Sequence, residues 1–305
     1  MTRVAAVDCG TNSIRLLIAD IEGTTLSDVD RRMEIVRLGE GVDRTGRFAP
    51  AALERTFAAC RRYAEIIEKT KAAGVRFVAT SASRDVANRD EFAAGVRAAF
   101  GVDPEVVTGD EEAELSFLGA TRELVDGGYE TPFLVVDIGG GSTEFVLGGT
   151  SVHAARSVDV GCVRMTERHL HDDPPTAEQV AAARADIDAA IALAAETVPI
   201  EQTATLVGLA GSVTTVAAMA LDLPAYLPER IHRSRIAAAE VRSVTERLLA
   251  MTREERTALP FMHPGRVDVI GAGALILACV VDAVAADEVL VSEHDILDGI
   301  AWSLA

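Results

Sequence analysis

Residues 133–144 read Phe-Leu-Val-Val-Asp-Ile-Gly-Gly-Gly-Ser-Thr-Glu, and residues 4–13 read Val-Ala-Ala-Val-Asp-Cys-Gly-Thr-Asn-Ser. In both stretches an apolar, strand-like run ends in an aspartate, and a turn of Gly, Ser or Thr leads into a second β-prone run. The bend of such a hairpin presents backbone N–H groups and hydroxyls as a concave set of donors suited to phosphate oxygens. The strand-end carboxylate, Asp8 or Asp137, can hold a hydrated divalent cation. The sequence therefore predicts two phosphate-gripping hairpins.

The elements around the hairpins predict two α/β domains with sheets covered on both faces. The first half predicts three strands up to residue 35, a helix over 51–73, strands over 75–80 and 105–107, and helices over 89–100 and from 111. The second half repeats the three strands and continues with a helix over 177–197, strands over 204–209 and 288–292, and a closing helix over 296–304. The Gly-rich stretch 126–132 predicts the link. We expect domains at 1–128 and 129–305, with residues 295–305 packing back on the first domain.

Composition limits the class of protein. The chain has 305 residues, 49% of them hydrophobic, which allows a large core and about two domains. An aromatic content of 4% and a net charge of −18 argue against nucleic acids and anionic membranes as partners. The apolar run 269–281 is too short to span a bilayer, and the N-terminus does not resemble a signal peptide. The cysteines have no metal-ligand spacing and indicate reduced thiols in the cytoplasm: Cys9, Cys60, Cys162 and Cys279.

Several charged or glycine-rich segments allow a structural and a functional interpretation. Glu112, at the start of a predicted helix, either favours the helix dipole or serves as a general base. Arg84, after a predicted buried strand, either clamps a phosphate or pairs with Asp85 at the surface. The strand–glycine–helix corner at 208–215 either holds an anion or packs tightly. The positive charges at 228–235 and Arg266 are interpreted as a solvated face.

The chain resembles the exopolyphosphatase and guanosine-pentaphosphate phosphohydrolase (Ppx/GppA) family of the actin-like ATPase and sugar kinase superfamily. The resemblance runs nearly end to end and is carried by residues 7–13, 80–88, 108–113, 137–144, 161–164, 208–215, 264–266 and 292–299. The glutamate after Gly-Gly-Gly-Ser-Thr and the Gly-x-Glu-Glu-Ala block distinguish this family from kinases and chaperone ATPases of the same superfamily.

The resemblance implies two actin-like (ribonuclease H-like) domains with an active-site cleft between them. It implies hydrolysis of the terminal phosphoanhydride of polyphosphate, assisted by Mg²⁺ or Mn²⁺. Glu112 would be the catalytic base, and Asp137 and Glu144 would be essential acidic residues near metal or water. Asp8 would help to hold the metal together with Asp137. The residues expected to bind phosphate are Asn12, Ser13, Arg84, Gly140, Gly141 and Ser142.

Many family members carry further helical domains, whereas this sequence ends at Ala305. The resemblance therefore points to short polyphosphate chains or to the terminus of guanosine pentaphosphate. The alternatives are a guanosine pentaphosphate 5'-phosphohydrolase, an ATPase or kinase that uses the 208–215 corner for adenosine, and an alarmone sensor without turnover. The resemblance, together with the apolar run 269–281, also points to a homodimer.

Overall fold

The computed structural model describes residues 1–23, 25–84 and 86–305, and its contacts divide the chain into two compact units. Unit 1 comprises Met1–Gly119 and Ile296–Ala305, and unit 2 comprises Ala120–Asp295. This division falls earlier in the chain than the expected boundary at 128/129. The reason is that the last turns of α4 (Gly109–Asp126) belong with unit 2, where Glu123 Oε2 lies 3.6 Å from His232 Nε2. The closing segment after residue 295 belongs to unit 1.

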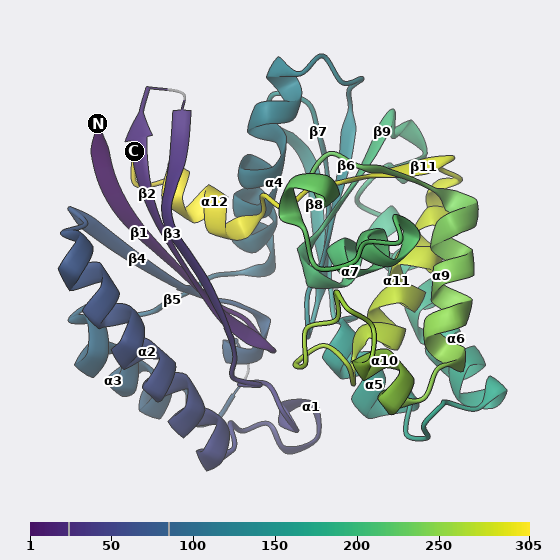
Figure 1. The fold of residues 1–305 in the computed structure, drawn as a ribbon, viewed down its shortest axis with the longest axis horizontal. Coiled ribbons are helices and arrows are strands. Elements are labelled where there is room, and N and C mark those ends of the chain that lie inside the picture. The colour runs from purple at the N-terminus through teal and green to yellow at the C-terminus, as the bar shows by residue number, and fades with distance from the viewer. Residues whose placement is uncertain (24, 85) are drawn as a thin grey trace. The chain divides into compact units, whose positions relative to one another are not determined.

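Unit 1 is a five-stranded sheet covered by helices (Figure 1). Its elements in chain order are β1 (Thr2–Cys9), β2 (Ser13–Glu22), β3 (Thr25–Ile35), α1 (Val42–Thr45), α2 (Pro50–Thr70), β4 (Gly74–Ala79), η1 (Ser81–Ser83), α3 (Arg89–Phe100), β5 (Glu105–Val106), the first turns of α4, and α12 (Ile296–Trp302). The strand order is β3-β2-β1-β4-β5. β1 to β3 form an antiparallel meander, and β4 runs parallel to both β1 and β5.

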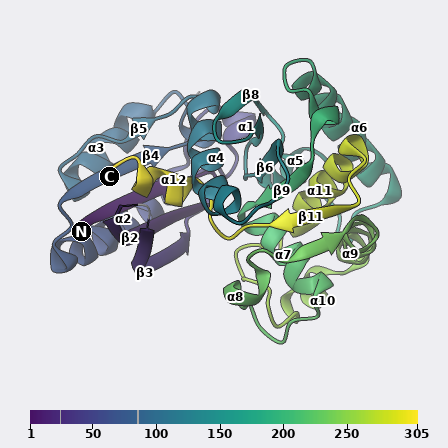
Figure 2. The same cartoon turned by 90° about the horizontal axis from the view of Figure 1, so that it is seen from above.

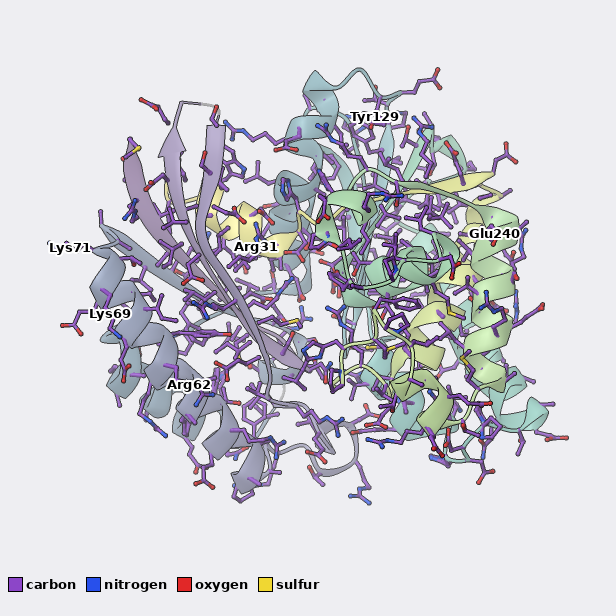
Figure 3. The ribbon with its side chains drawn as sticks, in the orientation of Figure 1. Arg31, Arg62, Lys69, Lys71, Tyr129 and Glu240 are labelled. Carbon is purple, nitrogen blue, oxygen red and sulfur yellow. The ribbon has the colours of Figure 1, made fainter. Side chains whose placement is uncertain are left out.

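The side chains of β1 alternate between two apolar clusters, as the pleat of a strand requires. Ala5 and Val7 belong to the cluster of α2 and α3, whereas Val4 and Ala6 belong to the cluster of α12. Figure 1 shows α2 and α3 on one side of these strands and α12 on the other. Arg31 on β3 forms an ion pair of 2.5 Å with Asp298, which ties α12 to the sheet. Figure 3 labels Arg31, which lies beside α12.

Unit 2 is a six-stranded sheet with a larger helical layer. After the last turns of α4, its elements are β6 (Phe133–Ile138), β7 (Thr143–Gly148), β8 (Val152–Val158), α5 (Cys162–His169), α6 (Ala177–Ala195), η2 (Ile200–Gln202), β9 (Thr205–Leu209), α7 (Ala210–Ala220), α8 (Pro228–Ile231), β10 (Arg235–Ala237), α9 (Ala238–Ala250), α10 (Arg253–Thr257), α11 (Ile270–Val284) and β11 (Glu288–Val291). The strand order is β10-β11-β9-β6-β7-β8.

The two sheets repeat one topology. Read from its third strand, unit 2 has the order β8-β7-β6-β9-β11, which matches β3-β2-β1-β4-β5 of unit 1, with β10 added at the edge. In each unit the first strand pairs antiparallel with the second and parallel with the fourth. The predicted α/β class with two similarly built domains is therefore confirmed. Helix α5, which begins directly after Gly161, was not predicted from the sequence.

The apolar run 269–281 forms most of α11, and residues 270–281 of this helix are all buried in unit 2. α9 and α11 lie side by side in both views (Figures 1 and 2). Because the apolar surface of α11 is used within its own unit, this helix gives no support to a dimer interface. Within the described ranges of the chain, every helix is too short or too polar to cross a membrane.

Candidate active site

The hairpin of β6 and β7 brings two carboxylates together. Asp137 and Glu144 are partners in the antiparallel ladder, so their side chains lie on the same face of the sheet. They are 7% and 1% exposed. Two buried carboxylates repel each other and are costly to desolvate, and a cation or a shared proton lowers that cost. The pair is therefore suited to holding a cation.

Ser157 holds one of these carboxylates from the neighbouring strand. It is the ladder partner of Glu144 on β8, and its hydroxyl donates to Glu144 Oε1 at 2.7 Å. A hydrogen bond to an ionised acceptor is short and about twice as strong as a neutral one. Ser157 therefore fixes the direction in which the Glu144 carboxylate points. Sequence reasoning did not find it, because cross-strand register is not visible in the chain.

The glycine loop between β6 and β7 has its carbonyl oxygens turned toward α5. The oxygens of Gly139 and Gly140 accept backbone N–H groups at the start of α5 at 2.9–3.1 Å, and that of Gly141 accepts Arg164 Nε at 2.7 Å. In a planar trans peptide the N–H points opposite to the C=O. The N–H groups of residues 140, 141 and 142 therefore point away from α5, as the predicted phosphate cradle requires.

Gly161 allows this arrangement. A Cβ at this position would lie 2.4 Å from the backbone carbon and oxygen of Gly140, so only glycine lets α5 approach the loop so closely. The segment Gly161–Arg164 was part of the family resemblance, but the sequence assigned it no role. Its role in the structure is to bind the carbonyl face of the loop.

The hairpin of β1 and β2 has the same turn as the hairpin of β6 and β7, but an arginine stands opposite its aspartate in place of a glutamate. The turn bond from Gly10 N–H to the Ser13 oxygen is 2.9 Å, and the equivalent bond between Gly139 and Ser142 is 3.0 Å. Asp8, 4% exposed, occupies the position of Asp137. Its ladder partner is Arg15, whose Nε and Nη2 donate to Asp8 Oδ2 at 2.9 and 2.7 Å.

The unit 1 turn is braced by a segment that follows β3. The Asn12 oxygen accepts the N–H groups of Val36 and Arg37 at 3.1 and 2.9 Å, and the Thr11 oxygen accepts that of Gly39 at 2.8 Å. By the same planar-peptide argument, the N–H groups of Asn12 and Ser13 point away from this segment. The turn therefore also presents donors, and both predicted phosphate-binding residues lie in it.

Arg84 and Glu112 meet in unit 1. Arg84 follows η1, and its Nη2 lies 3.0 Å from Glu112 Oε2. Glu112 is 7% exposed, and a buried carboxylate needs such a charged partner. The predicted alternative for Arg84, a pair with Asp85, falls on a residue outside the described part of the chain. The structure thus joins two of the predicted site residues.

At the start of α4, one glutamate caps the helix and the next is the buried carboxylate. Thr108 N–H donates to Glu111 Oε2 at 2.8 Å, and Glu111 N–H donates to Thr108 Oγ1 at 3.2 Å, which is a capping box. The Thr108 N–H bond lowers the pKa of the exposed Glu111 carboxyl. Capping therefore explains Glu111, and it does not explain why its neighbour Glu112 is buried against Arg84.

The corner between β9 and α7 is covered by an arginine. A Cβ at Gly211 would lie 2.3 Å from the Arg266 guanidinium carbon, so Arg266 packs directly on this glycine. Arg266 Nη1 lies 3.3 Å from Thr215 Oγ1, and its guanidinium carbon lies 5.9 Å from the Tyr226 ring centre. Of the two interpretations of the corner, this contact shows tight packing, and anion binding there stays a prediction. Arg266, which was expected on a solvated face, packs on this corner instead.

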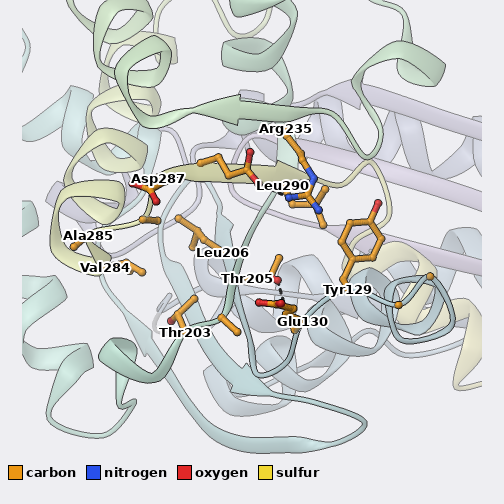
Figure 4. Close-up of a pocket in the computed structure, with 15 residues that line it drawn as sticks. Tyr129, Glu130, Thr203, Thr205, Leu206, Arg235, Val284, Ala285, Asp287 and Leu290 are labelled. Atoms are coloured by element: carbon orange, nitrogen blue, oxygen red, sulfur yellow. Dashed lines mark hydrogen bonds and ion pairs between the residues drawn. The ribbon is translucent and has the colours of Figure 1, made fainter.

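A pocket of about 840 Å³ lies elsewhere in unit 2 (Figure 4). It is lined by Tyr129, Arg235 and the residues that begin β9 and β11, and the Arg235 guanidinium lies 5.4 Å from the Tyr129 ring centre. Phe133 pairs with Thr205 near this pocket, whereas Asp137 pairs with Leu209, roughly 13 Å further along the strand at the usual strand rise. None of the predicted site residues lines this pocket.

The chain matches known proteins along almost its whole length. The model of the Ppx/GppA phosphatase family matches residues 17–305. The chain is 52% identical to a protein named Exopolyphosphatase 2 from Mycobacterium tuberculosis (strain ATCC 25618 / H37Rv), and the match covers 100% of this chain and 99% of that protein.

Solved structures agree with this match. A crystal structure of an exopolyphosphatase-like protein is 43% identical, with a TM-score of 0.97, and the match covers 100% of this chain and 98% of that one. The PPX-GPPA enzyme of Aquifex aeolicus is 31% identical, with a TM-score of 0.82, and 99% of each chain is covered. With the repeated sheet topology, these likenesses establish two similarly built α/β domains with the fold of the Ppx/GppA proteins. The chain belongs to the Ppx/GppA phosphatase family.

Proposed function

We propose that this protein is an exopolyphosphatase, which hydrolyses the terminal phosphoanhydride of inorganic polyphosphate and releases orthophosphate. The observation that carries the proposal is the β6–β7 hairpin, which combines inward-turned carbonyls, outward N–H groups at 140–142 and the buried pair Asp137 and Glu144. The full-length likeness to a protein named Exopolyphosphatase 2 supports the same substrate class. The net charge of −18 disfavours long polyanions, so we propose short chains as the preferred substrates.

The proposed reaction is direct attack of water on the terminal phosphorus. The new P–O bond forms as the bridging P–O bond breaks, the bridging oxygen leaves with the shortened chain, and the proton of the water passes to a carboxylate. Phosphoryl transfer asks mainly for positioning and for stabilisation of charge on the phosphoryl oxygens. Backbone N–H groups of residues 12, 13 and 140–142, together with Arg84, would supply these contacts.

Glu112 is the proposed general base. In the structure its carboxylate is paired with Arg84 at 3.0 Å. A substrate phosphate that binds Arg84 would weaken this ion pair and leave Glu112 more able to accept a proton. Substrate binding would thus activate the base. Glu144, held by Ser157, would help to orient the attacking water.

The donor set fits a hard divalent cation such as Mg²⁺ or Mn²⁺. Asp137 and Glu144 offer buried carboxylate oxygens, whereas Oδ2 of Asp8 is engaged by Arg15. We therefore propose that Asp137 and Glu144 hold the cation and that Asp8 contributes through its second oxygen or through water. A bound cation would neutralise charge that develops on the phosphoryl group.

The deciding experiment measures orthophosphate release from polyphosphates of graded length, from guanosine pentaphosphate and from ATP. We expect release from short polyphosphates in Mg²⁺, loss of release after chelation, and recovery when Mg²⁺ is returned. Faster release from guanosine pentaphosphate would assign the alternative phosphohydrolase activity. Faster turnover of ATP, or binding of guanosine pentaphosphate without any release, would contradict the proposal.

We further propose a cytoplasmic protein, because all four cysteines lie in the described part of the chain and are free and buried. Burial raises the pKa of the Cys60 and Cys279 thiols to about 12, which makes them unreactive. A homodimer is proposed from the family resemblance alone. Light scattering after size-exclusion chromatography tests it, and a monomer mass at micromolar concentration would contradict it.

A further inference from the structure

Three metal-ligand side chains meet in unit 2, outside the residues assigned to phosphate chemistry. Glu123 lies on α4, His232 follows α8, and His294 follows β11. One ligand atom from each lies within 4.8 Å of the other two. The three residues come from distant parts of the sequence, and no motif in the sequence points to a function for any of them.

The separations suit a shared ion better than hydrogen bonds. Glu123 Oε2 lies 3.6 Å from His232 Nε2 and 3.7 Å from His294 Nδ1, both beyond hydrogen-bond distance. His232 Nε2 is buried and has no hydrogen-bond partner among the described residues. Ligand atoms in a tetrahedral zinc site lie about 3.3–3.6 Å apart, because each bond is about 2.0–2.2 Å long. Small shifts of the side chains would bring all three atoms onto one ion.

The ligand types indicate a borderline transition metal. Two imidazoles and one carboxylate are the ligands of Zn²⁺ sites that keep a position open for water, whereas Mg²⁺ prefers oxygen ligands only. Arg233 Nη2 also lies 3.6 Å from Glu123 Oε2, and this cation must leave before a metal enters. Its side chain is 45% exposed and can turn into solvent.

The neighbouring backbone adds a specific constraint. His232 Nδ1 accepts the N–H of Glu293 at 3.2 Å, so in the neutral ring the proton sits on Nε2. A metal at Nε2 displaces that proton, and Nδ1 then takes up a proton and can no longer accept the Glu293 N–H. Metal binding therefore breaks one identifiable hydrogen bond, which gives the site a signature that an unspecific surface site lacks.

We propose that Glu123, His232 and His294 form a second metal site that binds Zn²⁺, with water completing the coordination. The site lies where the chain enters and leaves unit 2, since Glu123 follows the first passage at Gly119/Ala120 and His294 precedes the second at Asp295/Ile296. An ion bound there would fasten these two segments of unit 2 to each other.

The test uses Co²⁺, which absorbs visible light strongly in a tetrahedral site, as a probe in metal-stripped full-length protein with excess Mg²⁺. We expect one equivalent of Co²⁺ to bind and Zn²⁺ to displace it. His294→Gln and Glu123→Gln should each weaken Co²⁺ binding by about tenfold or more while circular dichroism stays unchanged. Two variants allow the test even if one fails to fold.

Two variants serve as controls and should leave the Co²⁺ spectrum unchanged. They are His171→Ala, at an exposed histidine, and Glu144→Gln, in the buried pair of Asp137 and Glu144. Amide hydrogen exchange at Glu293 should become faster when Zn²⁺ is added. The proposal is overturned if His294→Gln retains the spectrum, if Glu144→Gln abolishes it, or if the Glu293 amide does not respond. These readouts do not depend on phosphate release, so they stand apart from the proposed function.

Discussion

Asp137 and Glu144 lie opposite each other across one hairpin, at the two positions that Asp8 and Arg15 occupy across the equivalent hairpin of the other unit. The duplicated fold has thus diverged in charge at its central turn. Unit 1 neutralises its strand-end aspartate with a guanidinium, whereas unit 2 places a second carboxylate there.

Glu112→Gln is expected to lower kcat by about 10²–10⁴-fold while leaving KM nearly unchanged, because base catalysis is typically worth that much. Steady-state phosphate release measures both constants. Glu114→Gln, on the exposed face of α4, is the matched control and should turn over normally. Residues that act together in one reaction have non-additive effects. If Glu112 and Glu144 act together, the double variant should lower kcat by far less than the product of the fold-changes of the two single variants. Near-normal turnover of Glu112→Gln would remove Glu112 from the mechanism.

Ser157→Ala removes the hydroxyl that donates to Glu144 at 2.7 Å. Because the acceptor is a buried carboxylate, we expect the free energy of unfolding to fall by about 1–2 kcal/mol and kcat to fall about tenfold. Urea denaturation and initial rates check the two values. Ser151→Ala, in an exposed turn, should change neither. A loss of stability with full activity would show that Ser157 supports the fold only.

Arg15→Met leaves Asp8 without its ion pair in a position where the carboxylate is 4% exposed. Breaking such a pair is expected to lower the free energy of unfolding by about 3 kcal/mol. Adding Asp8→Asn to Arg15→Met should restore part of this loss, with a coupling energy between the two substitutions of about 1–3 kcal/mol. Denaturant unfolding of the two single variants and the double variant measures the coupling. Additive effects would mean that the pair contributes no interaction energy.

Gly161→Ala introduces a Cβ that would lie 2.4 Å from Gly140, so the loop at 139–142 must shift. A displacement of about 1 Å in a positioning element can cost up to about 10²-fold, and we expect kcat/KM to fall by about 10- to 100-fold. Gly149→Ala is the control, because its Cβ would meet Thr131 at an ordinary 3.8 Å. Equal activity of the two variants would count against the cradle.

Asp282 links stability to pH in unit 2. Partial burial raises the pKa of its carboxyl, but hydrogen bonds from Arg242 and Arg184 outweigh this and hold the pKa below its usual 3.8. Because the pKa of Asp282 is lower in the folded than in the unfolded protein, its ionised carboxylate stabilises the fold fully above about pH 3.8. This stabilisation is lost as the pH falls through the folded pKa. Asp282→Asn should therefore flatten the fall of Tm on acidification below about pH 4, whereas Glu240→Gln on α9 should not. Identical pH profiles would exclude this linkage.

The sequence determined the strands and helices around the two hairpins and the residues at which the chemistry can lie. Apolar runs that end in aspartate predicted β1 and β6, and the order of strands and helices predicted two similarly built α/β units. The glycine loop at 139–141 followed from residue type alone, since only glycine allows so close an approach to a backbone. These features depend on neighbours in the chain, which is why a single sequence contains them.

Only the tertiary structure decided which side chains meet. Cross-strand register paired Asp8 with Arg15 and Glu144 with Ser157, and the placement of α4 set Glu112 against Arg84. It likewise gathered Glu123, His232 and His294 from distant segments. Such contacts depend on how strands align and how helices pack, and a slip of one residue would turn every side chain of a strand to the other face. For that reason the sequence could predict which residues form the candidate site, but not which side chains each of them contacts.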